Sequence, residues 1–501
     1  MKYVIPTNVS RVTSLLIQAG YEAYLVGGCV RDLVLKKDPK DWDVTTNATP
    51  EKIIEIFEKE GERVVYENTF GTVAIIFEKE EITSQVRTIE VTPYRTESSY
   101  SDRRHPDIVN FAKTLSEDLE RRDFTMNALA LHPVTNEIVD IFGGLSDISN
   151  KIIRATGDPS VRFQEDALRM IRAIRFSAQL DFNIEEKTKE ALTINANLIE
   201  HVSHERIRDE FEKIIMSEKP MLGLELLREH NLLQFISPEL EEGIGVSQSR
   251  SHIYDVWEHC ARACDNATKQ AWPIHVRIAA LFHDVGKPRT RRHDKQHNIY
   301  TFYGHEVVGA RMVEKFLERL HFPKKLSEII VKLVRYHMFF SDTEKVSLSA
   351  VRRMIRNVGR EHIWDLMNVR RSDRIGMGRP MAAPYRLRMY ESMIDEATRD
   401  PIDVSMLAID GEVMIKELGM QPSKEIGWIL HVLLEEVLEN PKNNTKEHLI
   451  ERTKDLLELD IETLQTLGEK GKKMQQKADT EAVKQLRTKH TVKFEGKKSK
   501  R

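Results

Sequence analysis

The 501-residue chain is predicted to be an α+β protein, with a mixed sheet-and-helix domain at its N-terminus and an all-α remainder. Strand and helix signals alternate over roughly the first 145 residues, whereas helical patterns dominate from about residue 151 onward. Apolar residues make up 40% of the chain and charged residues 31%, which is enough apolar material to build substantial cores. A chain of this length is expected to form more than one domain.

The first elements can be placed from local patterns. Residues 24–26 predict a strand, which leads through two glycines into a helix over residues 29–36. Thr49 precedes Pro50 and Glu51, a cap with proline at the first helical position, and predicts a helix through residue 59. The apolar, β-branched stretches 70–77 and 85–94 predict two further strands.

Composition predicts the cellular compartment of the protein. No stretch approaches about 18 consecutive apolar residues, and the N-terminus lacks an apolar signal segment, so we expect neither a membrane span nor export. Three cysteines are too few for a disulfide framework, which predicts a cytoplasmic location. Cys260 and Cys264 lie one helical turn apart beside His259, but two thiols alone make a poor zinc site.

A glycine pair follows the first predicted strand. Gly27 and Gly28 let the backbone approach a phosphate, and the unpaired amides at the start of the next helix point towards it. Arg31 adds a guanidinium that suits phosphate oxygens. An ordinary tight turn would show the same pair of glycines, so the next motif decides between the two interpretations.

That motif is Asp41-Trp42-Asp43. Residues two apart in a strand face the same side, so both carboxylates would converge on one point. Paired carboxylates close behind a phosphate cradle predict a Mg²⁺ site for phosphoryl transfer, in which Asp41 and Asp43 are the catalytic metal ligands. Glu90, on a later predicted strand, is a candidate third carboxylate.

These residues carry a resemblance to a known family. The glycine pair, Arg31-Asp32 and Asp41-Trp42-Asp43 resemble the polymerase-β-like nucleotidyltransferase palm, and more narrowly the class II tRNA nucleotidyltransferases (CCA-adding enzymes) and bacterial poly(A) polymerases. Residues 121–128 (RRDFTMNA) match that family's second motif and residues 165–169 (EDALR) its nucleotide-selecting motif. The resemblance implies a head domain with this palm, followed by all-α neck, HD and tail domains.

Residues 163–180 predict one amphipathic helix, with apolar residues in one arc and charged residues on the other side. A surface helix with i,i+3 charge pairs would look the same. Beside a phosphate site these charged groups could recognise a nucleotide base, because a carboxylate only accepts hydrogen bonds and a guanidinium only donates them. Cytosine and adenine each offer an amino donor beside a ring-nitrogen acceptor, so Asp166 and Arg169 would accept C and A and leave buried groups unpaired with G or U.

The resemblance implies the same roles. In the family, the residues that match Asp166 and Arg169 act as a protein template for CTP and ATP. Further nucleotide contacts are implied for the residues that match Gly28, Arg31, Arg122, Arg172 and Arg175. The polar stretch 92–110 is expected to be a long loop, which in the family helps the final adenosine step, and its presence argues against an enzyme that adds only CC.

A second constellation lies further along the chain. Neutral imidazoles combined with carboxylates suit divalent transition metals, and an adjacent His-Asp pair can serve one centre or bridge two. His283-Asp284, with His259 upstream and His305, His337 and Asp373 downstream, resembles the HD phosphohydrolase superfamily, which implies a metal site and a phosphohydrolase side activity. The implied core ligands are His259, His283, Asp284 and Asp373, with His305 and His337 as additional ligands of two-metal members.

The expected domain order follows from these motifs. Residues 469–501 contain twelve Lys/Arg against four Asp/Glu and are expected to form a basic, disordered tail. The other expected parts are a head (1–145), a neck (146–240), an HD domain (241–380) and a helical tRNA-binding tail (381–468).

The leading functional hypothesis is addition or repair of the 3′-terminal CCA of tRNA from CTP and ATP without a nucleic-acid template. An A-adding specialist and a poly(A) polymerase are close alternatives, although poly(A) polymerases generally lack an HD domain. An alternative of another class is an HD phosphohydrolase whose N-terminal module only binds RNA. The expected partners are the tRNA 3′ end, CTP and ATP, with no membrane. The sequence does not predict the oligomeric state.

Overall fold

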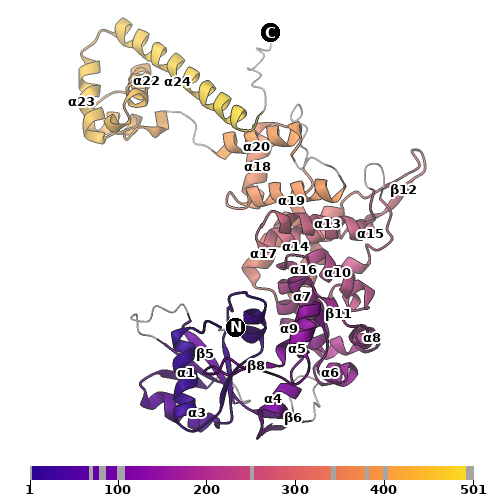
Figure 1. Cartoon of the computed structure of the whole chain (residues 1–501). Coiled ribbons are helices and arrows are strands. Elements are labelled where there is room, and N and C mark those ends of the chain that lie inside the picture. Colours follow the sequence, from indigo (N-terminus) through magenta and orange to yellow (C-terminus); the bar gives the residue numbers. More distant parts are fainter. Residues whose placement is uncertain are drawn as a thin grey trace. The chain divides into compact units, whose positions relative to one another are not determined.

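The computed structural model describes residues 3–66, 71–77, 86–98, 108–248, 253–339, 346–378, 383–398 and 404–491. The chain forms two compact units (Figure 1). Unit 1 contains residues 1–337 and 368–380, and unit 2 contains residues 338–367 and 381–501. Within the described parts of the chain, no helix is long and apolar enough to cross a membrane.

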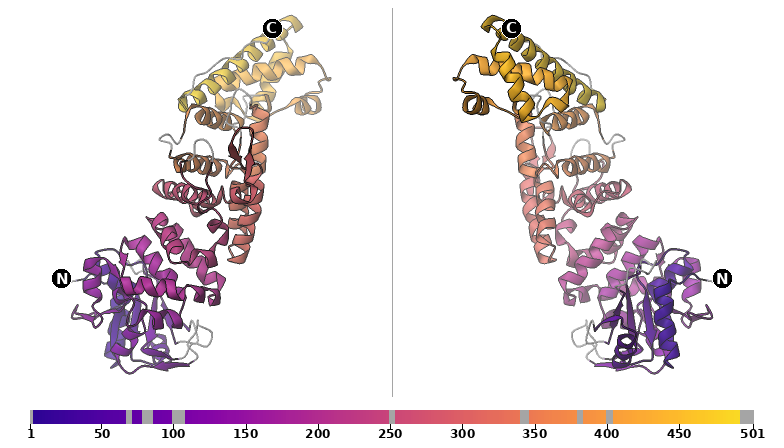
Figure 2. Two further views of the ribbon diagram at one scale, coloured as in Figure 1. Left: turned by 90° about the vertical axis from the view of Figure 1, so that its right-hand side faces the viewer. Right: turned by 90° about the vertical axis from the view of Figure 1, so that its left-hand side faces the viewer.

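The N-terminal part of unit 1 is a seven-stranded mixed sheet, as predicted, in the order β3-β4-β5-β2-β1-β8-β9. Its central strand β2 pairs antiparallel with β1 and parallel with β5, which places the ends of all three strands together. Both views of Figure 2 show these strands at the N-terminal end of the unit. The strands are β1 (Ala23–Val26), β2 (Asp43–Thr46), β3 (Arg63–Tyr66), β4 (Val73–Ile76), β5 (Thr88–Pro93), β8 (Leu129–Leu131) and β9 (Ile138–Asp140).

Helices pack on this sheet and follow it along the chain. Helix α1 (Thr7–Gln18) contacts β1, and α3 (Pro50–Lys59) contacts β3 and β4. The predicted cap holds, because Pro50 occupies the first turn of α3 and Ile53 and Phe57 are buried below it. Helix α2 (Gly28–Val34) follows β1 directly. The next helices are α4 (Leu115–Glu120), η1 (Thr125–Asn127) and α5 (Gly144–Asn150).

Two local expectations were wrong. The single helix expected over residues 163–180 is interrupted, because Asp166 has an extended backbone and its carboxylate accepts the backbone N–H of Leu168 at 3.1 Å. Two helices result, α6 (Pro159–Glu165) and α7 (Leu168–Leu180). The polar stretch expected to be a loop forms a hairpin in its described residues, with β6 (Arg95–Ser98) paired to β7 (Ile108–Phe111). The stretch between these strands lies outside the described residues.

The rest of unit 1 is helical except for two small sheets, β10 (Ile152–Ile153) with β11 (Asn183–Ile184) and β12 (Arg292–Asp294) with β13 (Ile299–Thr301). Its remaining helices are α8 (Glu186–Asn195), η2 (Ala196–His201), α9 (His204–Ile215), α10 (Pro220–Glu229), α11 (Leu233–Ile236), α12 (Pro238–Glu241), α13 (Val256–Lys269), α14 (Ile274–Phe282), α15 (Lys287–Thr290), α16 (His305–Arg319) and α17 (Lys324–Tyr336). Helix α19 (Ile363–Gly376) contributes residues 368–376 to this unit.

Unit 2 has its own apolar core, built mainly around α22 (Lys424–Glu439) and including Leu433, Leu434 and Leu464. Helix α24 (Ile461–Lys489) is the longest in the described parts of the chain; it lies against α22 and reaches α20 (Tyr385–Thr398). Its further elements are α18 (Leu348–Val358), α20 (Tyr385–Thr398), η3 (Val404–Met406), α21 (Gly411–Leu418), α22 (Lys424–Glu439), η4 (Pro441–Asn443), α23 (Lys446–Leu457) and α24 (Ile461–Lys489).

The expectation of a disordered tail from residue 469 was wrong through residue 489, because α24 contains these residues. Glycine lets α24 approach α22: a Cβ at Gly471 would lie 2.4 Å from the carbonyl oxygen of His431. At its end, Arg487 and Lys489 pair with Glu396 and Asp395 of α20 at 2.9 and 2.8 Å. Backbone contact and ion pairs thus order a segment whose charge alone favours solvent.

This packing predicts that Gly471→Ala loosens α24. The added methyl group has no space beside the His431 carbonyl, so we expect a loss of about 1–3 kcal/mol in the unfolding free energy of unit 2. Faster amide hydrogen exchange in α24 and a lower urea midpoint would show it. Gly427→Ala in α22 is the matched control. Its methyl group meets nothing within 4 Å, so a gain of up to about 1 kcal/mol is expected. Equal behaviour of the two variants would contradict this account.

Candidate active site and metal centre

The glycine turn after β1 lies at the centre of a charged cluster. Gly27 has φ +74°, a conformation that side chains disfavour. A Cβ at Gly27 would lie 3.0 Å from Arg122 Nη1 and 3.7 Å from Asp43 Oδ2. A Cβ at Gly28 would lie 3.7 Å from Arg31 Nη2. The turn therefore brings two arginines and one aspartate around a backbone that lacks side chains, which is the arrangement expected of a phosphate cradle.

Asp43 lies beside this turn, and Glu90 is on the neighbouring strand. Asp43 is the register partner of Val26 in β1 and of Glu90 in β5, so Glu90 lies beside it in the sheet. Asp41 is exposed and precedes β2, so the expectation that both aspartates lie within one strand was wrong by two residues. Burial raises the pKa of Asp43; Arg122 acts against this rise and Asp41 adds to it. A carboxyl whose ionised form is disfavoured by burial and by a nearby like charge is one that Mg²⁺ would stabilise in that form.

Asp118, a buried aspartate that no sequence motif identified, positions Arg122. Asp118 of α4 is fully buried. Its Oδ2 accepts Arg122 Nη2 at 3.1 Å and the Thr45 hydroxyl at 3.3 Å, and its Oδ1 accepts Arg121 Nη2 at 2.8 Å. Burial acts to raise the pKa of Asp118, but the two arginines outweigh it and hold the pKa below its usual range. Asp118 thereby connects the cradle to the central strand β2.

The arginines of α7 also have carboxylate partners within the protein. Asp123 links them to the cradle, because it accepts Asn127 Nδ2 at 3.0 Å and Asn127 in turn accepts Arg31 Nη1 at 2.9 Å. The guanidinium groups of Arg31, Arg172 and Arg175 lie 5.1, 5.5 and 3.8 Å from the ring centroid of Phe176. The α7 ion pairs are Arg169–Glu165 at 2.7 Å, Arg172–Asp123 at 2.6 Å and Arg175–Glu210 at 2.6 Å.

Asp166 is held from another helix. Arg206 of α9 contacts both its carboxylate oxygens, at 3.2 and 2.7 Å. The structure does not pair Asp166 with Arg169, whose guanidinium is buried against Glu165 and the carbonyl of Arg121. Sequence reasoning missed Arg206 and Glu210, both on α9. Their spacing of four residues could have marked one helical face, but nothing local points to partners about forty residues away.

The six predicted ligands of the second site converge in unit 1. All are buried, and they form two groups that share Asp284, each with its ligand atoms within 4.8 Å of one another. His259 Nε2 lies 3.0 Å from Asp284 Oδ2 and 3.4 Å from Asp373 Oδ1. The two groups are His259, His283, Asp284 and Asp373, and Asp284, His305 and His337.

Backbone carbonyls fix the orientation of three of these imidazoles. The Nδ1–H groups of His283, His305 and His337 donate to the carbonyls of Ala280, Phe302 and Val334, each at 2.7 Å. Because a carbonyl only accepts, each Nε2 keeps its lone pair and faces the centre. His305 Nε2 and His337 Nε2 lie 3.3 Å apart. Two lone pairs at that distance repel each other unless a cation lies beside both, so these residues fit a metal ion.

Charge points to the same conclusion. Burial acts against charging His283, but the carboxylates of Asp284 and Asp373 outweigh it and raise its pKa to about 10. A positive charge is therefore favoured between these carboxylates, and a metal ion would supply it while leaving the imidazole neutral. Lys287 adds a fixed cation, with Nζ 2.5 Å from Asp284 Oδ2. The site combines metal ligands with an ammonium group suited to a phosphate.

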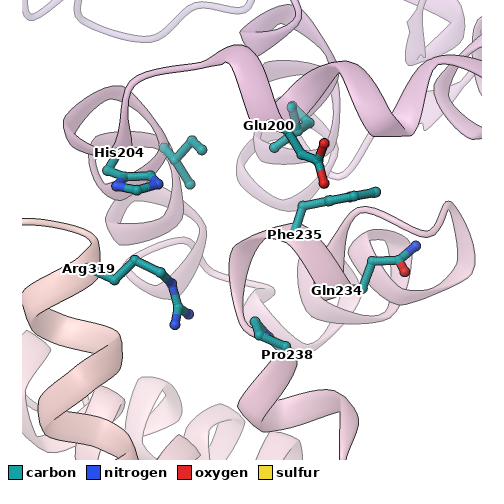
Figure 3. Close-up of a pocket in the computed structure, with 8 residues that line it drawn as sticks. Glu200, His204, Gln234, Phe235, Pro238 and Arg319 are labelled. Atoms are coloured by element: carbon teal, nitrogen blue, oxygen red, sulfur yellow. The ribbon is translucent and has the colours of Figure 1, made fainter.

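A separate pocket of about 290 Å³ lies between η2, α9, α11 and α16 (Figure 3). Glu200, His204 and Phe235 line it, together with Arg319. Arg319 already pairs with Glu239 of α12 at 2.7 and 2.9 Å, so this ion pair connects α16 to α12. The pocket holds none of the predicted site residues.

Comparison with known proteins agrees with the fold. Residues 23–154 match the poly A polymerase head domain, residues 181–244 match the probable RNA and SrmB-binding site of polymerase A, and residues 250–377 match the HD domain. Fold and site together therefore define a nucleotidyltransferase that also carries an HD domain. Both kinds of domain are typically metal-dependent.

Curated relatives narrow the class. The CCA-adding enzyme of Lactobacillus helveticus is 31% identical over 450 residues, which covers 89% of this chain and 96% of the relative. The chain belongs to the family of CCA-adding enzymes. The CCA-adding enzyme of Enterococcus faecalis is 46% identical over 227 residues, 45% of this chain and 53% of the relative.

Solved structures agree with this assignment. The Bacillus stearothermophilus CCA-adding enzyme in complex with CTP is 26% identical, with a TM-score of 0.57, and covers 89% of this chain and 97% of that one. The Thermotoga maritima CCA-adding enzyme complexed with tRNA_CCA shares the fold at 19% identity, with a TM-score of 0.53 over 91% of this chain and 97% of that one.

The geometry around Asp118 predicts the effect of Asp118→Asn. The change removes the buried charge that Arg121 and Arg122 share, so we expect a loss of about 3 kcal/mol in unfolding free energy and a raised KM for the nucleotide substrate. Because the folded pKa of Asp118 is depressed, its contribution is complete at neutral pH and is lost as the pH falls through that folded pKa. The stability gap should therefore narrow below about pH 4. Glu120→Gln, an exposed charge change in the same helix, is the control and should alter neither quantity.

Proposed function

We propose that this protein adds or repairs the 3′-terminal CCA of tRNA, using CTP and ATP and no nucleic-acid template. The convergence of the glycine turn, Arg122 and Asp43 carries this proposal. Membership of the CCA-adding family favours it over poly(A) tailing and over a purely hydrolytic role. The three cysteines are buried and free, which supports the prediction of a cytoplasmic location.

The reaction joins an RNA 3′ oxygen to the α-phosphorus of the nucleotide and breaks the bond between that phosphorus and the pyrophosphate. Asp41 and Asp43 would hold Mg²⁺, and Glu90 is placed to assist. When bound, this ion supplies activation of the 3′-hydroxyl and neutralises the pyrophosphate. Gly28 gives the phosphates access to the backbone, and Arg31 and Arg122 bind their oxygens.

Selection of C and A is assigned to Asp166 and Arg169, with Arg172 and Arg175 as further nucleotide contacts. A carboxylate has about four acceptor positions. In Asp166, three of them are occupied by Arg206 and the backbone N–H of Leu168. The remaining position suits the single amino group that C or A offers. Arg206 orients this carboxylate, so we assign it a positioning role.

The HD centre is proposed to be a hydrolytic site for a phosphoester, with divalent transition-metal ions held by His259, His283, Asp284 and Asp373, and by His305 and His337. The shared Asp284 and the Lys287 ammonium beside it support a two-metal arrangement. Lys287 would bind a phosphate oxygen, and the carbonyl-bound imidazoles keep their ligand atoms oriented.

The central experiment offers the purified protein tRNA lacking CCA, tRNA ending in CC and an oligo(A) primer, with labelled CTP and ATP. Three additions followed by a stop on the first substrate are expected. Open-ended tails would favour a poly(A) polymerase, and addition only to the CC-ended tRNA would identify an A-adding enzyme. Asp41→Asn and Asp43→Asn should each lower kcat by at least about 100-fold, because the metal ligands act on the transition state.

Selectivity provides a separate test. Asp166→Ala is expected to lose discrimination of CTP and ATP against GTP and UTP, measured as the ratio of kcat/KM values. Arg206→Ala should lower the same ratio in part, because Asp166 keeps its charge but loses the guanidinium that orients it. Unchanged selectivity in Asp166→Ala would rule out a side-chain template.

Metal content tests the HD centre. Elemental analysis of the purified protein is expected to find up to two transition-metal ions per chain. His337→Ala should lose one of them, and Asp284→Ala should lose both, because only Asp284 belongs to both ligand groups. His448→Ala, which removes an exposed histidine of unit 2, should lose none. Equal metal content in all variants would place any bound metal elsewhere.

A further inference from the structure

A hairpin emerges from the wall of the HD centre. Strands β12 and β13 connect α15, which begins at Lys287, with α16, which begins at His305; Figure 1 shows β12 projecting beside α15. The carbonyl of Phe302 accepts Nδ1–H of His305 at 2.7 Å, and the Phe302 ring centroid lies 5.7 Å from Lys287 Nζ. The base of the hairpin thus contacts His305, a predicted metal ligand, and lies near Lys287, the cation beside the predicted ligand Asp284.

The hairpin combines positive charge with exposed aromatic rings. Residues 292–301 contain two Lys/Arg, Arg292 and Lys295, and one acidic residue, Asp294. Arg292 and Lys295 are exposed. Tyr303 is 87% exposed, the highest fraction among the large apolar side chains of the described residues, and it lies two positions before His305. An aromatic ring left this exposed beside cations is typical of surfaces on which nucleic-acid bases stack.

Internal contacts hold the hairpin in one conformation. The guanidinium of Arg291 lies 3.7 Å from the ring centroid of Tyr300, and its Nη2 donates to the Ser247 hydroxyl at 2.9 Å. At the tip, Asp294 Oδ1 accepts the backbone N–H groups of Gln296 and His297 at 3.0 and 3.2 Å. A surface ordered before binding loses little conformational entropy when a ligand docks.

We propose that this hairpin, residues 292–301 together with Tyr303, binds single-stranded RNA and leads its phosphates past the HD centre. RNA matches both features of the surface, since its phosphates pair with Arg292 and Lys295 and its unstacked bases offer flat faces to Tyr303. An acidic peptide would satisfy the cations but not the exposed ring. The inference rests on the proposed RNA substrate and adds a second contact surface to it.

The test measures the Kd of the full-length, metal-loaded protein for a fluorescent single-stranded oligoribonucleotide, by anisotropy. Tyr303→Ala is expected to weaken binding about tenfold, the value of one base stacked on an aromatic ring. Tyr385→Ala is the matched control, because Tyr385 is also exposed, at 46%, and lies in unit 2. A duplex RNA of the same sequence should show no dependence on Tyr303, since its bases are stacked internally.

Charge is tested separately through salt dependence. For Arg292→Gln combined with Lys295→Gln, the slope of log Kd against log salt should fall by about 1.4, as expected when two contacts to single-strand phosphates are lost. Lys324→Gln combined with Lys325→Gln removes two exposed charges from α17 and should leave the slope unchanged. Photo-crosslinks from a 4-thiouridine oligomer are expected in the peptide that spans the hairpin.

Several results would overturn the proposal. They are unchanged affinity and salt slope in the hairpin variants, crosslinks only outside residues 291–303, or an equal loss of affinity for free AMP or for polyglutamate. The readout is binding, so it does not depend on either reaction. If the hairpin binds RNA but no phosphoester is hydrolysed, the hydrolytic assignment fails and this inference stands. If CCA addition is absent, the binding result still decides this question.

Discussion

The arginines of the N-terminal site keep their charge at any pH near neutrality, so each one brought into the protein interior requires a carboxylate partner. Unit 1 supplies these partners from helices and turns that are distant in sequence. Asp118 holds Arg122, and Glu210 holds Arg175. The consequence is a set of guanidinium groups already oriented around the glycine turn, whose charges a triphosphate would share with these carboxylates.

Each of the two sites brings together groups that repel one another, but the groups differ in kind. Beside the glycine turn, burial raises the pKa of Asp43 and the charge of Asp41 adds to this rise, so a negative charge is disfavoured there without a further cation. In the HD centre, oriented imidazoles bring Nε2 lone pairs to within 3.3 Å of one another. A divalent cation would stabilise both arrangements, but with different ligands: oxygen donors suit Mg²⁺, and mixed nitrogen and oxygen donors suit transition metals. Unit 1 therefore brings together two donor sets that differ in the metal they would prefer.

Sequence patterns predicted the elements that depend on neighbours in the chain. The strand before Gly27 and the helix that begins at Pro50 agree with the structure, because caps, turns and strand periodicity are local properties. The HD ligands were predicted from a family resemblance instead, and the structure brings them together. The break at Asp166 was missed because the amphipathic pattern continues through it, whereas Asp166 leaves the helical conformation and is held there by the backbone N–H of Leu168 and by Arg206.

The sequence by itself determined which residues are candidates for the chemistry, since Gly27, Asp43 and Asp284 lie in motifs whose residue types and spacing fit metal and phosphate binding. Only the tertiary structure decided which charges meet. Asp118, Arg206 and the hairpin before His305 acquire their roles from contacts between distant segments, and local periodicity does not encode such contacts. The glycine turn was visible in the sequence, but the need for glycine became clear only when Arg122 and Asp43 were found within 4 Å of the place where a side chain would lie.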